Sequence, residues 1–142
     1  MGTYRGIRNC RKFLVSVNAT GKSLPVTLAI VSIAILKIIY IFINRKIDTV
    51  YITCSRSIKG SLFDFFVIGI SKTFGASIVN HLHGADFRDY FTRLAGSWKR
   101  IAGRLYGMID VSIVLTEGMK EQLRPLFPSM RLEVVPNFYS QE

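Results

Sequence analysis

Short apolar runs alternate with longer apolar stretches along most of the chain. Runs of five or six mostly apolar residues predict strands at 13–17, 49–53, 77–82, 111–116 and 131–135. The stretches between them predict helices over 26–43, 61–74, 88–108 (interrupted near Gly96-Ser97) and 117–124. The predicted element order is therefore β-α-β-α-β-α-β-α-β.

The predicted strands are apolar nearly throughout, which is typical of strands buried on both faces. Together with the alternating order, this predicts an α/β fold: a Rossmann-like parallel sheet with helices on both faces. Ligands bind such sheets at the carboxyl ends of the strands. We therefore expect the functional edge at the loops that follow residues 17, 53, 82, 116 and 135, and structural loops at the opposite edge.

The stretch 26–43 contains 18 residues, of which Thr27, Ser32 and Lys37 are polar or charged. At about 100° per residue these three fall on different sides, so the pattern shows no solvent face. A bilayer span needs about 20 apolar residues, and Lys37 would be costly inside one. A buried or membrane-apposed helix is the favoured interpretation, and a transmembrane helix remains the alternative.

Charge is concentrated in the first third of the chain. The 142 residues hold 19 Lys and Arg against 9 Asp and Glu, and residues 1–46 contain eight basic residues and no acidic one. This favours an anionic partner, such as a negatively charged membrane surface or a phosphate-bearing substrate. No nucleic-acid-binding motif is visible, so nucleic acid is not expected. Residues 1–12 are interpreted as a basic N-terminal segment ahead of one domain, 13–142.

The loop after the predicted strand 77–82 contains candidate functional residues. His83 and Gly84 follow that strand, and Asp86 precedes the next helix, where a His and an Asp can hydrogen-bond sugar or phosphate oxygens. His81 is expected to face the core or a helix. A metal site at these residues is disfavoured because no third His exists.

Two stretches carry a family resemblance. Ile78-Val-Asn-His-Leu-His-Gly-Ala-Asp-Phe87 resembles the strand and His-Gly loop of retaining GT-B type glycosyltransferases of family 4. Ile109-Asp-Val-Ser-Ile-Val-Leu-Thr-Glu-Gly-Met-Lys120, followed by Val134-Val-Pro-Asn137, is similar to the end of that family's N-terminal domain. The resemblance extends loosely over most of the chain.

The resemblance implies transfer of a sugar from a nucleotide-sugar donor to a glycan or lipid-linked acceptor in cell-surface polysaccharide synthesis, at the cytoplasmic face of the inner membrane. It implies no metal ion and no cofactor besides the donor substrate. By match to the motifs, His83 is the catalytic histidine, and the substrate-binding residues are Gly84, Asp86, Thr116, Glu117 and Asn137.

The sequence also departs from the family pattern. The donor-binding C-terminal domain, the first strand and its Gly-rich loop are not found, so we expect an incomplete N-terminal domain that is inactive alone, with a complementing C-terminal domain as a possible partner. A missing first strand leaves a sheet edge and apolar surface exposed, which predicts poor solubility. The alternative is a small membrane-anchored α/β binding protein with 26–43 as its transmembrane helix. A third hypothesis, nucleotide-triphosphate binding by residues 16–23, is weaker because Ser16 replaces the first glycine of the phosphate-binding loop.

Overall fold

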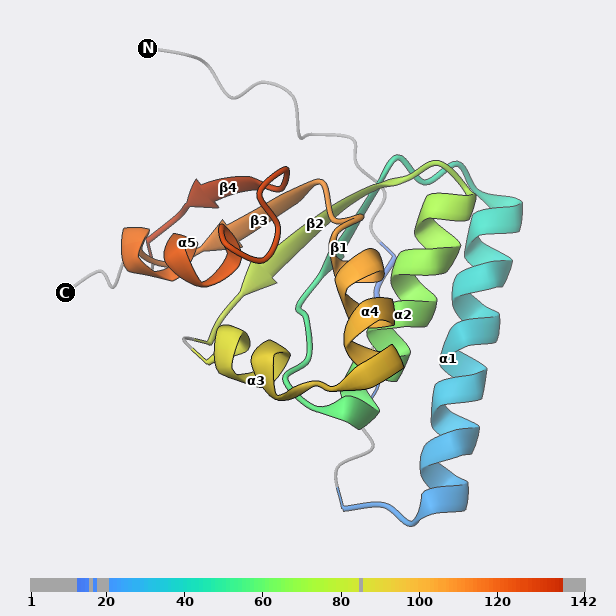
Figure 1. Cartoon of the computed structure of the whole chain (residues 1–142). Coiled ribbons are helices and arrows are strands. Elements are labelled where there is room, and N and C mark those ends of the chain that lie inside the picture. The colour runs from blue at the N-terminus through green and yellow to red at the C-terminus, as the bar shows by residue number, and fades with distance from the viewer. Residues whose placement is uncertain (1–12, 16, 18–20, 85, 137–142) are drawn as a thin grey trace, which may run out of the picture.

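The computed structural model describes residues 13–15, 17, 21–84 and 86–136 (Figure 1). Its elements are α1 (Leu24–Asn44), β1 (Thr49–Ile52), α2 (Ile58–Thr73), β2 (Ser77–Leu82), α3 (Phe87–Arg93), α4 (Gly96–Tyr106), β3 (Val111–Val114), α5 (Glu117–Leu123) and β4 (Arg131–Val134). The strands form one sheet in the order β1-β2-β3-β4, and every neighbouring pair is parallel. The predicted α/β class with a parallel sheet is confirmed.

The described helices cover one face of this sheet. Because the strand order follows the sequence, right-handed crossovers place the connecting helices on the same side. Burial agrees, since Ile78, Leu82 and Val114 are buried on one face, whereas on the other Tyr51 is exposed and Ile113 is half-buried. The prediction of helices on both faces is therefore wrong for the part of the chain that the structure describes.

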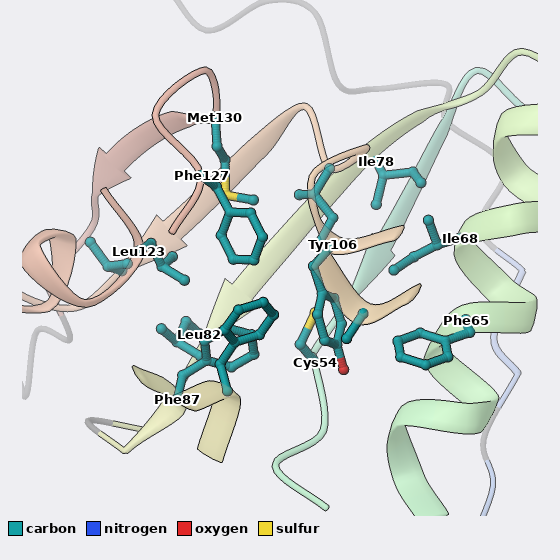
Figure 2. Packing of buried hydrophobic residues seen from close by; sticks show 14 of the residues in the cluster. Cys54, Phe65, Ile68, Ile78, Leu82, Phe87, Tyr106, Leu123, Phe127 and Met130 are labelled. Carbon is teal, nitrogen blue, oxygen red and sulfur yellow. The ribbon is translucent and has the colours of Figure 1, made fainter. Parts of the chain in front are cut away.

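The main core lies between the sheet and the helices α2 to α5 (Figure 2). Phe87 sits at its centre, with its ring edge-to-face with Tyr106 at 5.4 Å and 6.5 Å from the ring of Phe127. On α4, Ala102 and Tyr106 point into this core, whereas Ile101 is exposed. The helix α4 therefore turns its Ala102 and Tyr106 side toward the core.

A second, smaller cluster joins α1 to α2 and to β1. Ile38 and Phe42 of α1 pack with Val67 of α2 and with Ala76. The ring of Phe42 stacks on Phe74 at 5.1 Å. Figure 1 shows α1 and α2 side by side, with α4 on the other side of α2.

Two local expectations are corrected, and one is confirmed. The described residues of the expected strand 13–17 form no strand, and Val15 packs into the second cluster. The expected interruption near Gly96-Ser97 is confirmed, because Leu94 and Ala95 separate two helices and Gly96 adopts a left-handed φ of 57° that a continuous helix excludes. The second predicted helix begins at Ile58 rather than Ser61.

The outer edge of β1 borders a groove of about 1390 Å³, which is lined by residues of α1 and α2 and by Phe13, Leu14, Val15 and Val17. Within the described residues β1 pairs only with β2, so this is an open sheet edge. An open edge beside apolar walls is a site where strands can associate, and the expectation of poor solubility stays a prediction.

Candidate functional site

A pocket of about 330 Å³ opens at the carboxyl ends of β1 and β2. Residues 53–57 form one wall, and Leu82, His83 and Gly84 form the other. Both walls are loops that follow adjacent parallel strands, so the sheet brings together two segments about 30 positions apart in the sequence. The pocket therefore lies at the edge where ligands of parallel sheets bind.

An ion pair closes over Gly84. The guanidinium Nη1 of Arg56 donates to Oδ1 of Asp86, and this hydrogen bond holds the pKa of the Asp86 carboxyl below its ordinary value. A Cβ atom at position 84 would collide with Nη1 of Arg56 and lie 2.7 Å from Oδ1 of Asp86. Only a glycine at this position leaves the pair where it is.

The loop after β1 is fixed by buried polar side chains. The Cys54 amide donates to Oδ1 of Asn80 over 3.0 Å, and Asn80 Nδ2 donates to Ser112 Oγ over 2.8 Å. The next amide, of Ser55, donates to Oδ2 of Asp64 over 2.6 Å. This wall of the pocket is therefore held by side chains of β2, β3 and α2, which indicates a preorganised loop.

The helix α2 begins in the same wall. The Ser57 side chain caps it by accepting a hydrogen bond from the Gly60 amide over 3.1 Å. The positive end of the helix dipole thus lies beside Arg56. Together they make this side of the pocket suited to an anion.

Asp64 belongs to a buried network below the loop. Tyr106 Oη lies 3.1 Å from Oδ2 of Asp64 and 3.1 Å from Oγ of Ser61. Ser61 Oγ donates to the Ser57 carbonyl over 2.8 Å and is also hydrogen-bonded to Tyr90. Burial raises the pKa of Asp64 although the bonds from Ser55 and Tyr106 oppose the shift. The Asp64 side chain therefore links the loop after β1 to the buried hydroxyl groups of Ser61 and Tyr106.

The two histidines occupy the sheet face that no described helix covers. His81 Nδ1 is hydrogen-bonded to Tyr51 Oη, and the rings of His81 and His83 lie 4.0 Å apart. Burial, and then the charge of His83, lowers the pKa of His81. The expectation that His81 faces the core or a helix is wrong, because residues 81 and 83 share the open face.

The structure brings three of the six predicted site residues together. His83 and Gly84 line the pocket, and Asp86 reaches it through Arg56. Thr116 caps α5 by accepting from the Met119 amide over 3.3 Å, so a structural role accounts for it.

Glu117 lies at the same end of β3 and pairs with Lys120 over 3.2 Å. Neither Thr116 nor Glu117 lines the pocket, and Asn137 lies outside the described residues.

Arg56 is the charged residue of the pocket wall, and sequence reasoning missed it. Its signal was present, since it is a cation in the loop that directly follows a predicted strand at the functional edge. Its pairing with Asp86 depends on a contact across 30 positions, which no local pattern contains.

Two further hypotheses concern a metal site and the loop at residues 16–23. Among the described residues no group of three or more His, Cys, Asp or Glu side chains gathers as a metal site would. Four residues of the 16–23 loop (Ser16, Asn18, Ala19 and Thr20) lie outside the described part, and Lys22 is exposed.

Comparisons with protein-family models, with curated proteins and with solved structures returned no match to this chain.

Proposed function

We propose that this chain is the acceptor-side domain of a retaining glycosyltransferase of the GT-B type, working at the cytoplasmic face of the inner membrane. The observation that carries the proposal is the pocket in which His83 and Gly84 meet Arg56 at the carboxyl edge of a parallel sheet. The same His-Gly pair carries the sequence resemblance. A phosphate-bearing sugar matches this pocket, because an imidazole can bond hydroxyls while a guanidinium and a helix N-terminus attract phosphate.

In the proposed reaction the bond between sugar C1 and the nucleotide phosphate breaks, and a bond from C1 to an acceptor hydroxyl oxygen forms. The acceptor proton leaves with the released nucleotide. His83 would hydrogen-bond the transferred sugar, and Arg56 would balance negative charge that grows on the departing phosphate. Asp86 would accept a hydrogen bond from an acceptor hydroxyl once its pair with Arg56 opens.

A GT-B active site closes between two Rossmann-like domains, and the described residues form one sheet. The remaining donor-binding groups would therefore come from a second domain, in the same or another polypeptide. Where such a domain is encoded beside this reading frame, co-expression should give donor-sugar turnover that His83→Ala removes.

A binding test needs only the chain itself. Glucose 1-phosphate, which carries a sugar and a phosphate, is titrated while the amide resonances of Ser55, Ser57 and Gly84 are followed by NMR. We expect saturable shifts at these amides that Arg56→Gln and His83→Ala weaken. Arg131→Gln is the matched control, because Arg131 is exposed at the amino end of β4, opposite the pocket, and pairs with Glu133. Shifts that are absent, or equal in all variants, would contradict the proposal.

A further inference from the structure

The helix α1 has two sides, and both are apolar. Its packed side is formed by Ala34, Ile38 and Phe42, which follow one another at four-residue spacing and are buried. The opposite side consists of Pro25, Ala29, Ile33, Leu36, Tyr40 and Ile43, all exposed. These six follow a spacing of three and four residues, so they form one stripe that points away from the domain.

A surface helix of a water-soluble domain is polar on its outer side. On α1 the large outer side chains of Ile33, Leu36, Tyr40 and Ile43 are instead between 65% and 67% exposed. The polar Ser32 and the charged Lys37 lie on its flanks, to either side of the stripe. By length and composition α1 would suffice to cross a bilayer.

The neighbouring helix also exposes apolar side chains. Ile58, Leu62 and Phe66 of α2 recur every four residues and are all exposed. Since α1 and α2 lie side by side (Figure 1), two adjacent helices expose apolar stripes to solvent.

The charges on α1 and directly beside its ends are basic, and the first acidic residue after it, Asp48, is exposed and lies 3.8 Å from the Lys46 ammonium. Lys22 precedes it, Arg45 and Lys46 follow it, and Lys37 lies on its flank. No acidic residue occurs between positions 21 and 47. An apolar surface with a basic border matches an anionic bilayer, where the side chains enter the acyl boundary and the cations meet headgroups.

The packing of α1 decides how it would meet the bilayer. A perpendicular span would either break the contacts of Ile38 and Phe42 with α2, or carry α2 with it into the hydrocarbon. The second course would bury the Asp64 carboxylate and the Lys72 ammonium in lipid, which is costly. A helix lying in the plane of the interface keeps every contact and covers the outer stripe.

We propose that the outer faces of α1 and α2 form a lipid-docking surface that rests on an anionic bilayer, with α1 in the membrane plane. The proposal does not depend on sugar transfer, and it is tested without any sugar.

Vesicle flotation of the full chain tests it. Vesicles of phosphatidylcholine with about one-third phosphatidylglycerol are compared with vesicles of phosphatidylcholine alone, and we expect tighter binding to the anionic set. Leu36→Glu should weaken binding about tenfold or more, because one large apolar side chain leaves the lipid. Met108→Glu, a similar change at a residue 45% exposed and on neither helix, should bind as the wild type does. Circular dichroism confirms that both variants are folded.

Equal binding by Leu36→Glu and the wild type would overturn the proposal. A second result would also overturn it: a wild-type protein that does not float with vesicles but forms a dimer in solution, which Leu36→Glu converts to a monomer. The outer stripe would then bind a second copy of the chain and not a bilayer.

The orientation is tested in reconstituted vesicles, with Ser23→Cys and Asn44→Cys made in a Cys10→Ser background. A membrane-impermeant maleimide should label both ends of α1 from outside, because an in-plane helix leaves both ends on one side of the bilayer. Cys54 is buried, so it should add little background labelling. Protection of one end in every vesicle would show a span and refute the in-plane arrangement.

Discussion

Removing one hydroxyl from the buried network should destabilise the whole domain. In Tyr106→Phe the ring keeps its place in the core, and only the Oη atom that lies 3.1 Å from Asp64 and from Ser61 is lost. Both the tyrosine and the aspartate are buried, so water does not replace the lost donor. The Asp64 carboxylate then keeps the Ser55 amide at 2.6 Å and the weak Ser55 hydroxyl contact at 3.4 Å.

The expected magnitude follows from the charge of the acceptor. Leaving a buried charged acceptor short of one donor costs about 1.5–3 kcal/mol. For a chain of this size that corresponds to a loss of about 4–9 °C in Tm. Tyr90→Phe is the matched control, because it removes a neutral hydroxyl–hydroxyl bond to Ser61 worth about 0.5–1.5 kcal/mol.

The effect should also depend on pH. The Tyr106 hydrogen bond lowers the pKa of Asp64, so its removal raises a pKa that burial has already raised above the ordinary 3.8. A raised folded pKa means that stability is fully present below pH 3.8 and is lost as pH rises through the folded pKa. The difference in the free energy of unfolding between Tyr106→Phe and the wild type should therefore be largest near neutral pH and small in acid.

Urea unfolding followed by circular dichroism, at neutral and acidic pH, measures these differences. In an Asp64→Asn background the cost of Tyr106→Phe should fall to that of a neutral hydrogen bond. A Tyr106→Phe variant within about 0.5 kcal/mol of the wild type at neutral pH would refute the assignment, since surface changes alone give differences of that size.

Two further predictions concern the two edges of the sheet. Gly84→Ala should displace the flexible Arg56–Asp86 pair, leave Tm nearly unchanged, and weaken glucose 1-phosphate binding in the NMR titration. Unchanged binding would show that the position of this pair does not matter for binding in the pocket. At the opposite edge, Lys72→Met removes an ammonium 2.6 Å from Asp110. Burial alone would raise the pKa of Asp110, but this ammonium and the Ile78 amide hold it below 3.8. Stability from the pair is present above pH 3.8 and is lost as pH falls through the lowered pKa. Because both side chains are partly exposed, Lys72→Met should lower the free energy of unfolding by at most about 1 kcal/mol at neutral pH, by less in high salt and not at all in strong acid. A loss of stability that persists in acid would refute the role of the Lys72–Asp110 pair.

The lipid-docking surface and the pocket would act together if both proposals hold. The amino ends of α1 and α2 point to the same side of the domain (Figure 1), and the pocket lies beside the start of α2. In-plane docking would therefore hold the pocket near the headgroups, within reach of a lipid-linked acceptor. Vesicle binding without sugar binding, or the reverse, would show that one proposal fails without the other.

The sequence by itself determined the order of the helices and strands and the edge where the pocket lies. Short apolar runs, longer apolar stretches and the glycines that end them are local signals, so four of the five predicted strands were found. The described residues of the run 13–17 form no strand. A strand depends on pairing with a neighbour, and a run of apolar residues only makes such pairing possible.

Only the tertiary structure decided which faces are covered. An apolar strand fits a sheet covered on one face or on both, and the choice follows from the strand order and the hand of the crossovers. That choice turned His81 to the open face, and it brought Arg56 to Asp86 across 30 positions. For α1, an apolar stretch without a polar side, packing against α2 determined which stripe faces outward. Local sequence does not contain these outcomes, because each depends on contacts between residues far apart along the chain.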